Sequence, residues 1–179
     1  MKELLFAGSA VLTCCLLACS GNMGNQGGMS DKAKKNLAAG EAVAKMFESG
    51  DFSKVGDYIA ADAVDHTGMN GGEVKGLDSM KAEFSRMGDM MSNMKNEIVK
   101  EIADDDYAFQ WMKESGTMKV DEMGMKAGTA YAFNAIEVSK FNADSKVTDH
   151  WSFMNMNDMM KMMPQMPMEN KMDTAMKKK

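Results

Sequence analysis

The chain has 179 residues, of which 26% are charged and 45% hydrophobic, and its formal net charge is −5 at pH 7. Because acidic and basic residues are interspersed, the sequence has no basic field that would hold nucleic acid. It contains no phosphate-binding loop and no HExxH or GxSxG motif, and two histidines without suitable cysteines make no zinc pattern. We therefore expect no nucleic-acid partner, no metal and no cofactor.

The first 19 residues predict where the protein resides. Lys2 precedes an apolar run that is too short to span a bilayer, for which roughly 20 residues are needed, but suits the core of a signal peptide. The run ends in Leu16-Leu17-Ala18-Cys19, which resembles the lipobox of bacterial lipoproteins. The resemblance implies a signal peptide over residues 1–18, a lipid on Cys19, and attachment to the bacterial cell envelope at the outer membrane. The alternative is an ordinary secretory signal.

All three cysteines lie in this leader segment, so the mature domain has no disulfide and no cysteine nucleophile. Residues 19–30 are rich in Gly and Asn, as in a flexible tether. We expect one folded domain over residues 31–163 and a disordered tail over residues 164–179.

Helical patterns come first in this domain. Ser30 or Asp31 caps a helix that runs to about residue 49, and Gly50 ends it. A short second helix is expected from Ser53. A third begins near Asp78 and carries an apolar stripe at helical spacing.

After Ser92 the hydrophobic period changes from that of a helix to that of a strand. Strands are expected over 95–103, from residue 107 onward, over 129–141 and over 146–154, followed by a short Met-rich helix that ends before Pro164. Helices that precede a run of antiparallel strands indicate an α+β fold. We expect three N-terminal helices packed on a strongly curved antiparallel sheet, a cone that the short C-terminal helix closes.

Methionine is over-represented, with 24 residues, whereas only two leucines remain after the leader. Leu and Met exchange in cores at little cost, so Met in core or pocket-lining positions is the first interpretation. The alternative is a soft-metal or oxidant buffer, because thioethers favour Cu(I). Its candidates are the C-terminal cluster of Met154, Met156, Met159, Met160, Met162, Met163, Met166 and Met168.

Four segments, 47–51, 62–66, 75–80 and 144–151, together resemble the SnoaL-like polyketide cyclase family, within the cone fold of nuclear transport factor 2. The last of these segments, which ends in His150-Trp151, is the most specific. The resemblance implies a cone with an apolar interior and a histidine, His66, at the pocket mouth. The family often has an acid or base four residues after this Trp, but here the residue is Asn155, which cannot exchange a proton near neutral pH.

His66 is therefore the candidate catalytic residue, as a general base. His150 is the weaker candidate, because neighbouring strand residues face opposite sides and Trp151 is expected to face the pocket. For the same reason neither Asp-His dipeptide is a dyad by itself. The expected ligand pocket is closed by the helix near Met159 and is lined by Trp111, Tyr131, Asn134, Trp151 and Asn155.

These features predict a lipid-anchored envelope protein that binds a small apolar or amphipathic molecule. One alternative is an acid/base enzyme of the isomerase or cyclase type that uses His66. Another is the Met-based soft-metal or oxidant buffer. A plain interaction module is also open, since cones of this kind often form homodimers through the outer face of the sheet.

Overall fold

The computed structural model describes residues 28–69, 71–122 and 124–162. The predicted signal peptide, Cys19, most of the predicted tether and the predicted tail lie outside these described residues. Within them, no helix is both long enough and apolar enough to cross a membrane.

Two α-helices precede the long strands. Helix α1 (Asp31–Ser49) begins after Ser30, whose hydroxyl accepts a hydrogen bond from the backbone N–H of Ala33 at 3.0 Å. It ends at Gly50, whose φ of 71° lies in the left-handed region that glycine adopts without strain. Helix α2 (Leu77–Met90) buries Met80, Phe84 and Met90. Both helices agree with the periodicity of the sequence.

The second of the three expected N-terminal helices does not form. Its place is taken by one 3-10 turn, η1 (Val55–Asp57), which buries Val55 completely. The physical reason is that strand β1 (Ile59–Asp65) already begins two residues later, and Ile59 pairs with Val147 of the last strand. Too few residues remain between α1 and β1 for an α-helix.

One six-stranded sheet holds the rest of the fold, in the order β2-β1-β6-β5-β4-β3. Its remaining strands are β2 (Val74–Lys75), β3 (Met91–Ala103), β4 (Tyr107–Met118), β5 (Ala130–Phe141) and β6 (Val147–Met154). The expectation of an antiparallel sheet holds for every pair but one, because β1 and β6 are parallel. The sheet is therefore mixed, and the fold class is α+β.

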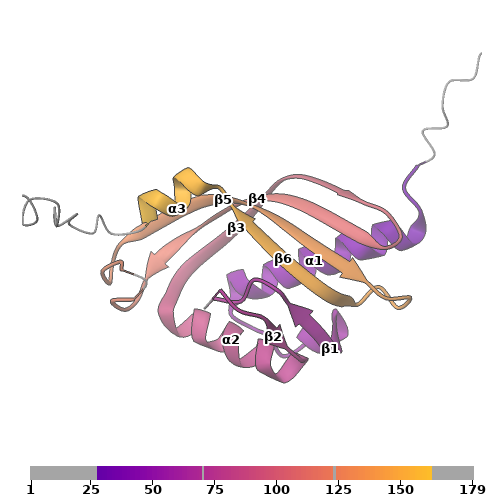
Figure 1. The fold of residues 1–179 in the computed structure, drawn as a ribbon, viewed down its shortest axis with the longest axis horizontal. Coiled ribbons are helices and arrows are strands. Elements are labelled where there is room, and N and C mark those ends of the chain that lie inside the picture. The colour runs from indigo at the N-terminus through magenta and orange to yellow at the C-terminus, as the bar shows by residue number, and fades with distance from the viewer. Residues whose placement is uncertain (1–27, 70, 123, 163–179) are drawn as a thin grey trace, which may run out of the picture.

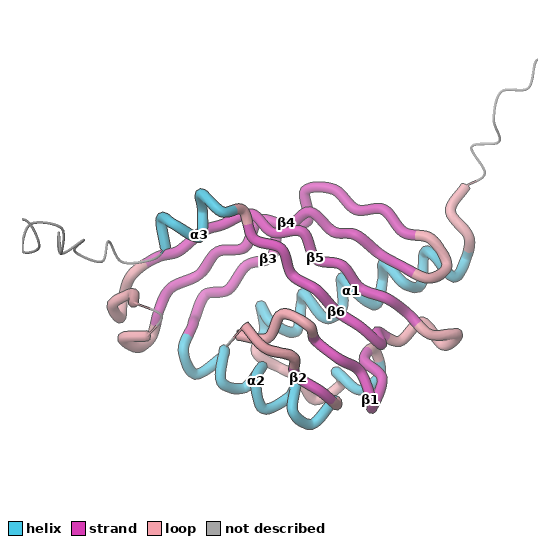
Figure 2. The backbone as a smooth tube through the Cα atoms, viewed as in Figure 1, coloured by secondary structure: helices cyan, strands magenta, loops and turns pink. Residues whose placement is uncertain are grey.

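Helices α1 and α2 pack on the same face of the curved sheet, as Figure 1 and Figure 2 show. The apolar core lies between them and the strands, and it includes Leu37, Val55, Met80, Phe84 and Phe141. The short third helix, α3 (Met156–Met162), follows β6 and contacts β5 (Figure 1). Among the described residues, α1 and α2 therefore cover one face of the sheet, and α3 contacts the other face at β5.

Candidate functional site: a cavity with a carboxyl-rich wall

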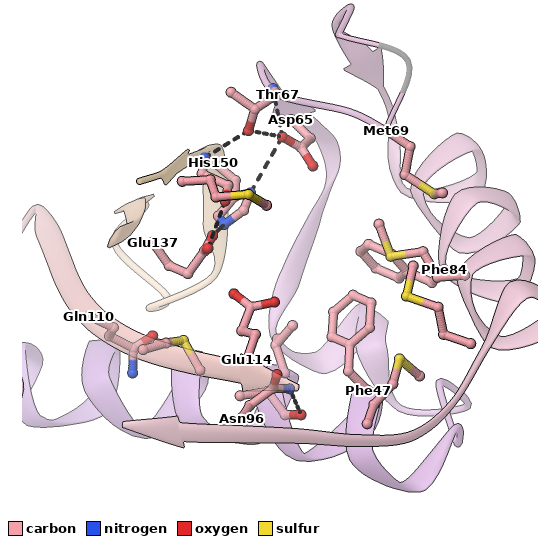
Figure 3. Close-up of a pocket in the computed structure, with 18 of the residues that line it drawn as sticks. Phe47, Asp65, Thr67, Met69, Phe84, Asn96, Gln110, Glu114, Glu137 and His150 are labelled. Atoms are coloured by element: carbon pink, nitrogen blue, oxygen red, sulfur yellow. Dashed lines mark hydrogen bonds and ion pairs between the residues drawn. The ribbon is translucent and has the colours of Figure 1, made fainter. Parts of the chain in front are cut away.

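A cavity of about 310 Å³ lies between the two helices and the sheet. Small-molecule sites in proteins have volumes of roughly 300–1,000 Å³, so this cavity is at the small end of that range. Much of its wall is apolar. Phe47 from α1 and Phe84 from α2 pack edge to face with their ring centroids 4.8 Å apart (Figure 3).

Methionine supplies the largest share of the apolar wall. Nine of the described methionines line the cavity, which confirms the pocket-lining interpretation for them. They are Met69, Met80, Met87, Met91, Met94, Met112, Met118, Met125 and Met154. Unbranched, polarisable side chains adapt to ligands of varied shape. In the C-terminal cluster, by contrast, Met156 and Met160 are exposed on α3.

The opposite wall is polar and is centred on His150 of β6. Its Nε2 lies 2.9 Å from a carboxylate oxygen of Glu137, and its Nδ1 lies 3.4 Å from a carboxylate oxygen of Asp65 (Figure 3). The second oxygen of Glu137 accepts a hydrogen bond from the hydroxyl of Ser152 at 2.7 Å. Asp65 in turn accepts two hydrogen bonds from Thr67. Both ring nitrogens of His150 therefore have a carboxylate partner.

Long-range strand pairing brings this cluster together. In the parallel pair of β1 and β6, Asp65 lies directly beside His150. A register shift in the pairing of β5 with β6 falls between Val147 and Asp149. Such a bulge changes which face the following residues occupy. As a result Val147 and His150, three residues apart, both line the cavity.

The pKa of His150 is raised to about 10. Burial by itself favours the neutral ring, but the hydrogen bonds to Asp65 and Glu137 and their negative charges outweigh it. Burial acts to raise the pKa of Asp65, but the hydrogen bond with His150 and the positive charge of its ring hold this pKa below its ordinary value. At neutral pH the imidazole is therefore a cation whose two N–H groups are already engaged.

Glu114 of β4 faces this cluster from the neighbouring wall (Figure 3). Burial, the negative charge of Glu137 and a hydrogen bond with Glu137 raise the pKa of Glu114 to about 8, against a smaller opposing effect of the His150 charge. Burial and the nearby Glu114 charge also raise the pKa of the Tyr131 phenol to about 12. Glu114 and Glu137 thus form a carboxyl pair that holds an exchangeable proton near neutral pH.

His66, the residue that the sequence analysis chose, does not line the cavity. It follows Asp65 in the chain and lies on the other face of the sheet, where its ring stacks on Trp151 at a centroid distance of 4.6 Å. Its ring nitrogens lie 2.9 Å from Glu73 and 3.1 Å from Asp149. The two Asp-His dipeptides thus exchange partners, with Asp65–His150 inside the cavity and Asp149–His66 outside.

The aromatic residues of the expected pocket divide in the same way. Tyr131 lines the cavity, and so does its neighbour Phe133, with the two ring centroids 6.0 Å apart. Trp111 and Trp151 belong to the outer face, and the residue Trp111 is 45% exposed. The expected convergence of His66, Trp111, Tyr131 and Trp151 on one cavity therefore does not occur.

The two candidate asparagines hold the last helix instead of facing a ligand. Asn134 donates a side-chain hydrogen bond to the carboxylate of Asp158 at 3.1 Å. Asn155 precedes α3, and its side chain accepts a hydrogen bond from the backbone N–H of Asn157 at 2.8 Å. Helix α3 therefore packs on β5, and neither Asn134, Asn155 nor Met159 lines the cavity.

Three residues of the polar wall, Asp65, Glu114 and Glu137, are not among the site residues expected from the sequence. The strand period of two does indicate them. Glu137 shares one face of β5 with Tyr131 and Phe133, and Glu114 shares one face of β4 with Gln110 and Met112. A carboxyl group on the aromatic face of a strand is unusual and points to a site. Among the described residues, no group of three or more His, Cys, Asp or Glu side chains is arranged to hold a metal ion.

The profile of the SnoaL-like polyketide cyclase family matches residues 38–166, which is more than half of the chain. The protein therefore belongs to the SnoaL-like polyketide cyclase family, as the four sequence segments indicated. No curated protein sequence matches it.

Solved structures share the fold at low sequence identity. The chain is similar to TsrD from Streptomyces laurentii, with 15% identity, a TM-score of 0.62 and coverage of 72% of this chain and 94% of that one. It is also similar to an LEH-like epoxide hydrolase from M. tuberculosis, with 15% identity, a TM-score of 0.60 and coverage of 74% and 91%. IdmH from Streptomyces antibioticus has 17% identity, a TM-score of 0.61 and coverage of 71% and 96%. At these identities the likeness concerns the fold alone.

Proposed function

We propose that this protein binds a small amphipathic molecule in the cavity between its helices and its sheet. The observation that carries the proposal is the division of the cavity wall. Phe47, Phe84 and the methionines supply an apolar surface for the body of the ligand, whereas the carboxyl groups of Glu114 and Glu137 supply hydrogen-bonding groups for its polar end. A mostly apolar cavity with a few convergent polar groups is the usual form of a small-molecule site.

Filling the cavity tests this proposal. Ala44 lines the cavity from α1, whereas Ala38 lies on the exposed side of the same helix. Octanol, a neutral amphiphile, should bind the unmodified protein in a calorimetric titration. Ala44→Phe should weaken this binding by an order of magnitude or more, because its ring occupies the space of the ligand, and Ala38→Phe should leave it unchanged. Equal binding by the two variants would place the ligand elsewhere.

Acid/base chemistry is the second candidate, and the carboxyl pair of Glu114 and Glu137 favours it over His66. A group whose pKa lies near the working pH can both take up and release a proton, and the pKa of Glu114 is about 8. Should a turnover assay be found, kcat should depend on a group that titrates near this value. Glu114→Gln should then abolish turnover while ligand binding persists, and a variant that keeps its turnover would remove this candidate.

We further propose that the protein is anchored to the bacterial cell envelope by a lipid on Cys19, at the outer membrane. The support is the segment Leu16-Leu17-Ala18-Cys19 with Ser20 after it. Mass spectrometry of the processed N-terminus should find an acylated Cys19. Cys19→Ala should leave an unprocessed precursor, whereas the matched change Cys15→Ala should be processed normally. An unmodified N-terminus at or after Cys19 would contradict the proposal.

A further inference from the structure

The charges of the cavity wall are not balanced. Among the described residues that line it, three are acidic, Asp65, Glu114 and Glu137, and the single basic side chain is that of His150. No Lys or Arg is in this lining set. The imidazolium of His150 already lies between Asp65 and Glu137, which leaves Glu114 without a cationic partner in the wall.

A proton held by the wall itself offsets this imbalance. Glu114 faces Glu137 in the cavity wall (Figure 3), and two ionised carboxylates that face each other in this way repel one another. Burial in the first place, and then the negative charge of Glu137 and a hydrogen bond with it, raise the pKa of Glu114 to about 8. A shared proton is the smallest cation that can lie between the two groups, and any other cation that enters would compete with it.

We propose that the ligand of this cavity is a cationic amphiphile, an amine whose ammonium group binds between the carboxylates of Glu114 and Glu137 while its apolar part packs against Phe47, Phe84 and the methionines. The proposal rests on the proposed binding function and names the chemical class of its ligand. An ammonium group donates the hydrogen bonds that two carboxylates accept, and such charge-assisted bonds are about twice as strong as neutral ones. A carboxylate ligand would instead be repelled by the negative charge of Glu137 and could not replace the proton of Glu114.

Binding of an ammonium group should release a proton. The charged and titratable groups that face Glu114 are Glu137 and Tyr131 on β5 and His150 on β6, with Asp65 on β1 behind His150. The cavity-lining residues of α1, α2 and β3 include no charged side chain. The ammonium ion displaces the proton of Glu114 to solvent, so that charge balances, and the ligand keeps its own protons.

Three probes of equal chain length test the proposal on the purified protein: octylamine, octanol and octanoate. At neutral pH octylamine should bind more tightly than octanol, by on the order of tenfold, which is the size expected for hydrogen bonds to a charged group. Octanoate should bind most weakly. Calorimetry in buffers of different ionisation enthalpy should find close to one proton released per octylamine bound and none for octanol.

Glu114→Gln supplies the decisive variant, because Gln has the shape of the protonated carboxyl and should leave the fold intact. It should reduce the affinity for octylamine to that for octanol and abolish proton release. The matched change Glu97→Gln, on an exposed site of β3, should alter neither. Octanoate binding as tightly as octylamine, or a Glu114→Gln variant with full preference for octylamine, would overturn the proposal. If octanol binds as tightly as octylamine, the proposal of a cationic ligand is overturned but the proposed binding function stands. If none of the three probes binds, the proposed binding function is overturned as well.

Discussion

The imidazole of His150 connects the two halves of the polar wall. It holds the carboxylates of Asp65 and Glu137 apart by lying between them, and each pairs with one ring nitrogen. Removing one member of a partly buried ionic group leaves the others without compensation, which costs more than the group contributes when intact. His150 is therefore expected to matter for stability as well as for the site.

His150→Gln should destabilise the fold by about 3 kcal/mol, at the lower end of what loss of a buried ionic partner costs. His66→Gln is the matched control, because the His66 side chain also lies between two carboxylates and is similarly accessible, 26% exposed against 29% for His150, but it lies outside the cavity, where solvent screens such pairs. Urea unfolding of both variants measures the difference. Equal losses of stability would contradict the assignment of His150 to the interior.

The pH dependence of stability tests Glu114. Its pKa rises from the ordinary value of 4.5 to about 8 on folding, so between these values the native state holds a proton that the unfolded chain has released. The contribution of Glu114 to the free energy of unfolding is fully present below pH 4.5, and it is lost as the pH rises through about 8. Glu114→Gln, which does not titrate, should therefore become more stable relative to the unmodified protein over this range. Parallel stability curves from urea unfolding at stepped pH would show that Glu114 is not buried beside Glu137.

At the scale of the elements, α1 and β4 approach each other closely at the wall of the cavity. Gly40 of α1 faces Gln110 of β4, and a Cβ atom at position 40 would lie 2.7 Å from the amide oxygen of Gln110. The Gln110 side chain cannot move freely, since it is buried and its amide donates a hydrogen bond to Glu101 at 2.9 Å. Glycine in this helix therefore allows a close approach of helix and sheet.

Two Gly→Ala substitutions separate this packing effect from helix propensity. A Cβ atom at Gly88 of α2 would have no neighbouring atom within 4 Å, so Gly88→Ala should stabilise the fold by up to about 1 kcal/mol through propensity. Gly40→Ala should give no gain in stability, because the cost of displacing the Gln110 side chain offsets the gain in helix propensity. Chemical denaturation measures both, and the Gln110→Ala background should restore the gain at position 40. A clear gain in stability from Gly40→Ala alone would mean that α1 and β4 are farther apart at this point than the distance to Gln110 indicates.

At the scale of the whole molecule, the outer face of the sheet is as notable as the cavity. Strand register places apolar side chains in two rows across this face. One row is Ile102, Phe109, Val138 and Trp151, and the other contains Trp111, Ile136 and Phe153. Phe153 is 55% exposed. Large apolar patches on a soluble domain mark contact surfaces.

We propose that a second copy of this chain covers the outer face, since an apolar sheet face is complementary to itself and suits a two-fold interface. Light scattering after size exclusion should find a dimer. Joint replacement Trp111→Lys and Phe153→Lys should give a monomer with octanol binding retained, because neither residue lines the cavity. Val120→Lys changes an exposed apolar residue that lies beyond the end of β4, outside the two rows, and should leave the dimer intact. A monomeric unmodified protein would refute the proposal.

The order of the elements could be predicted from local signals. Ser30 and Gly50 define the ends of α1 through backbone hydrogen bonding and left-handed geometry, which depend on neighbouring residues only. Alternation with a period of two also places Tyr131 and Phe133 on one face of β5 and Asn134, Ile136 and Val138 on the other. The family resemblance was confirmed over residues 38–166.

Which strand face points inward was decided by the tertiary structure. A period of two assigns residues to two sides but does not say which side the helices will cover. Trp111 and Trp151, which were expected to line the pocket, lie on the face opposite the cavity, where Trp111 is 45% exposed. The carboxyl groups of Glu114 and Glu137 therefore line the cavity in place of the two tryptophans.

The choice between the two histidines depended on pairing between distant segments. Sequence alone determined that Asp65 and His66 face opposite ways, as do Asp149 and His150. Only the parallel pairing of β1 with β6, together with the register shift before Asp149, placed Asp65 beside His150 inside the cavity and Asp149 beside His66 outside. Local periodicity is a property of consecutive residues, whereas register and bulges are settled by strands about 85 residues apart, and that is why the site became visible only in the folded chain.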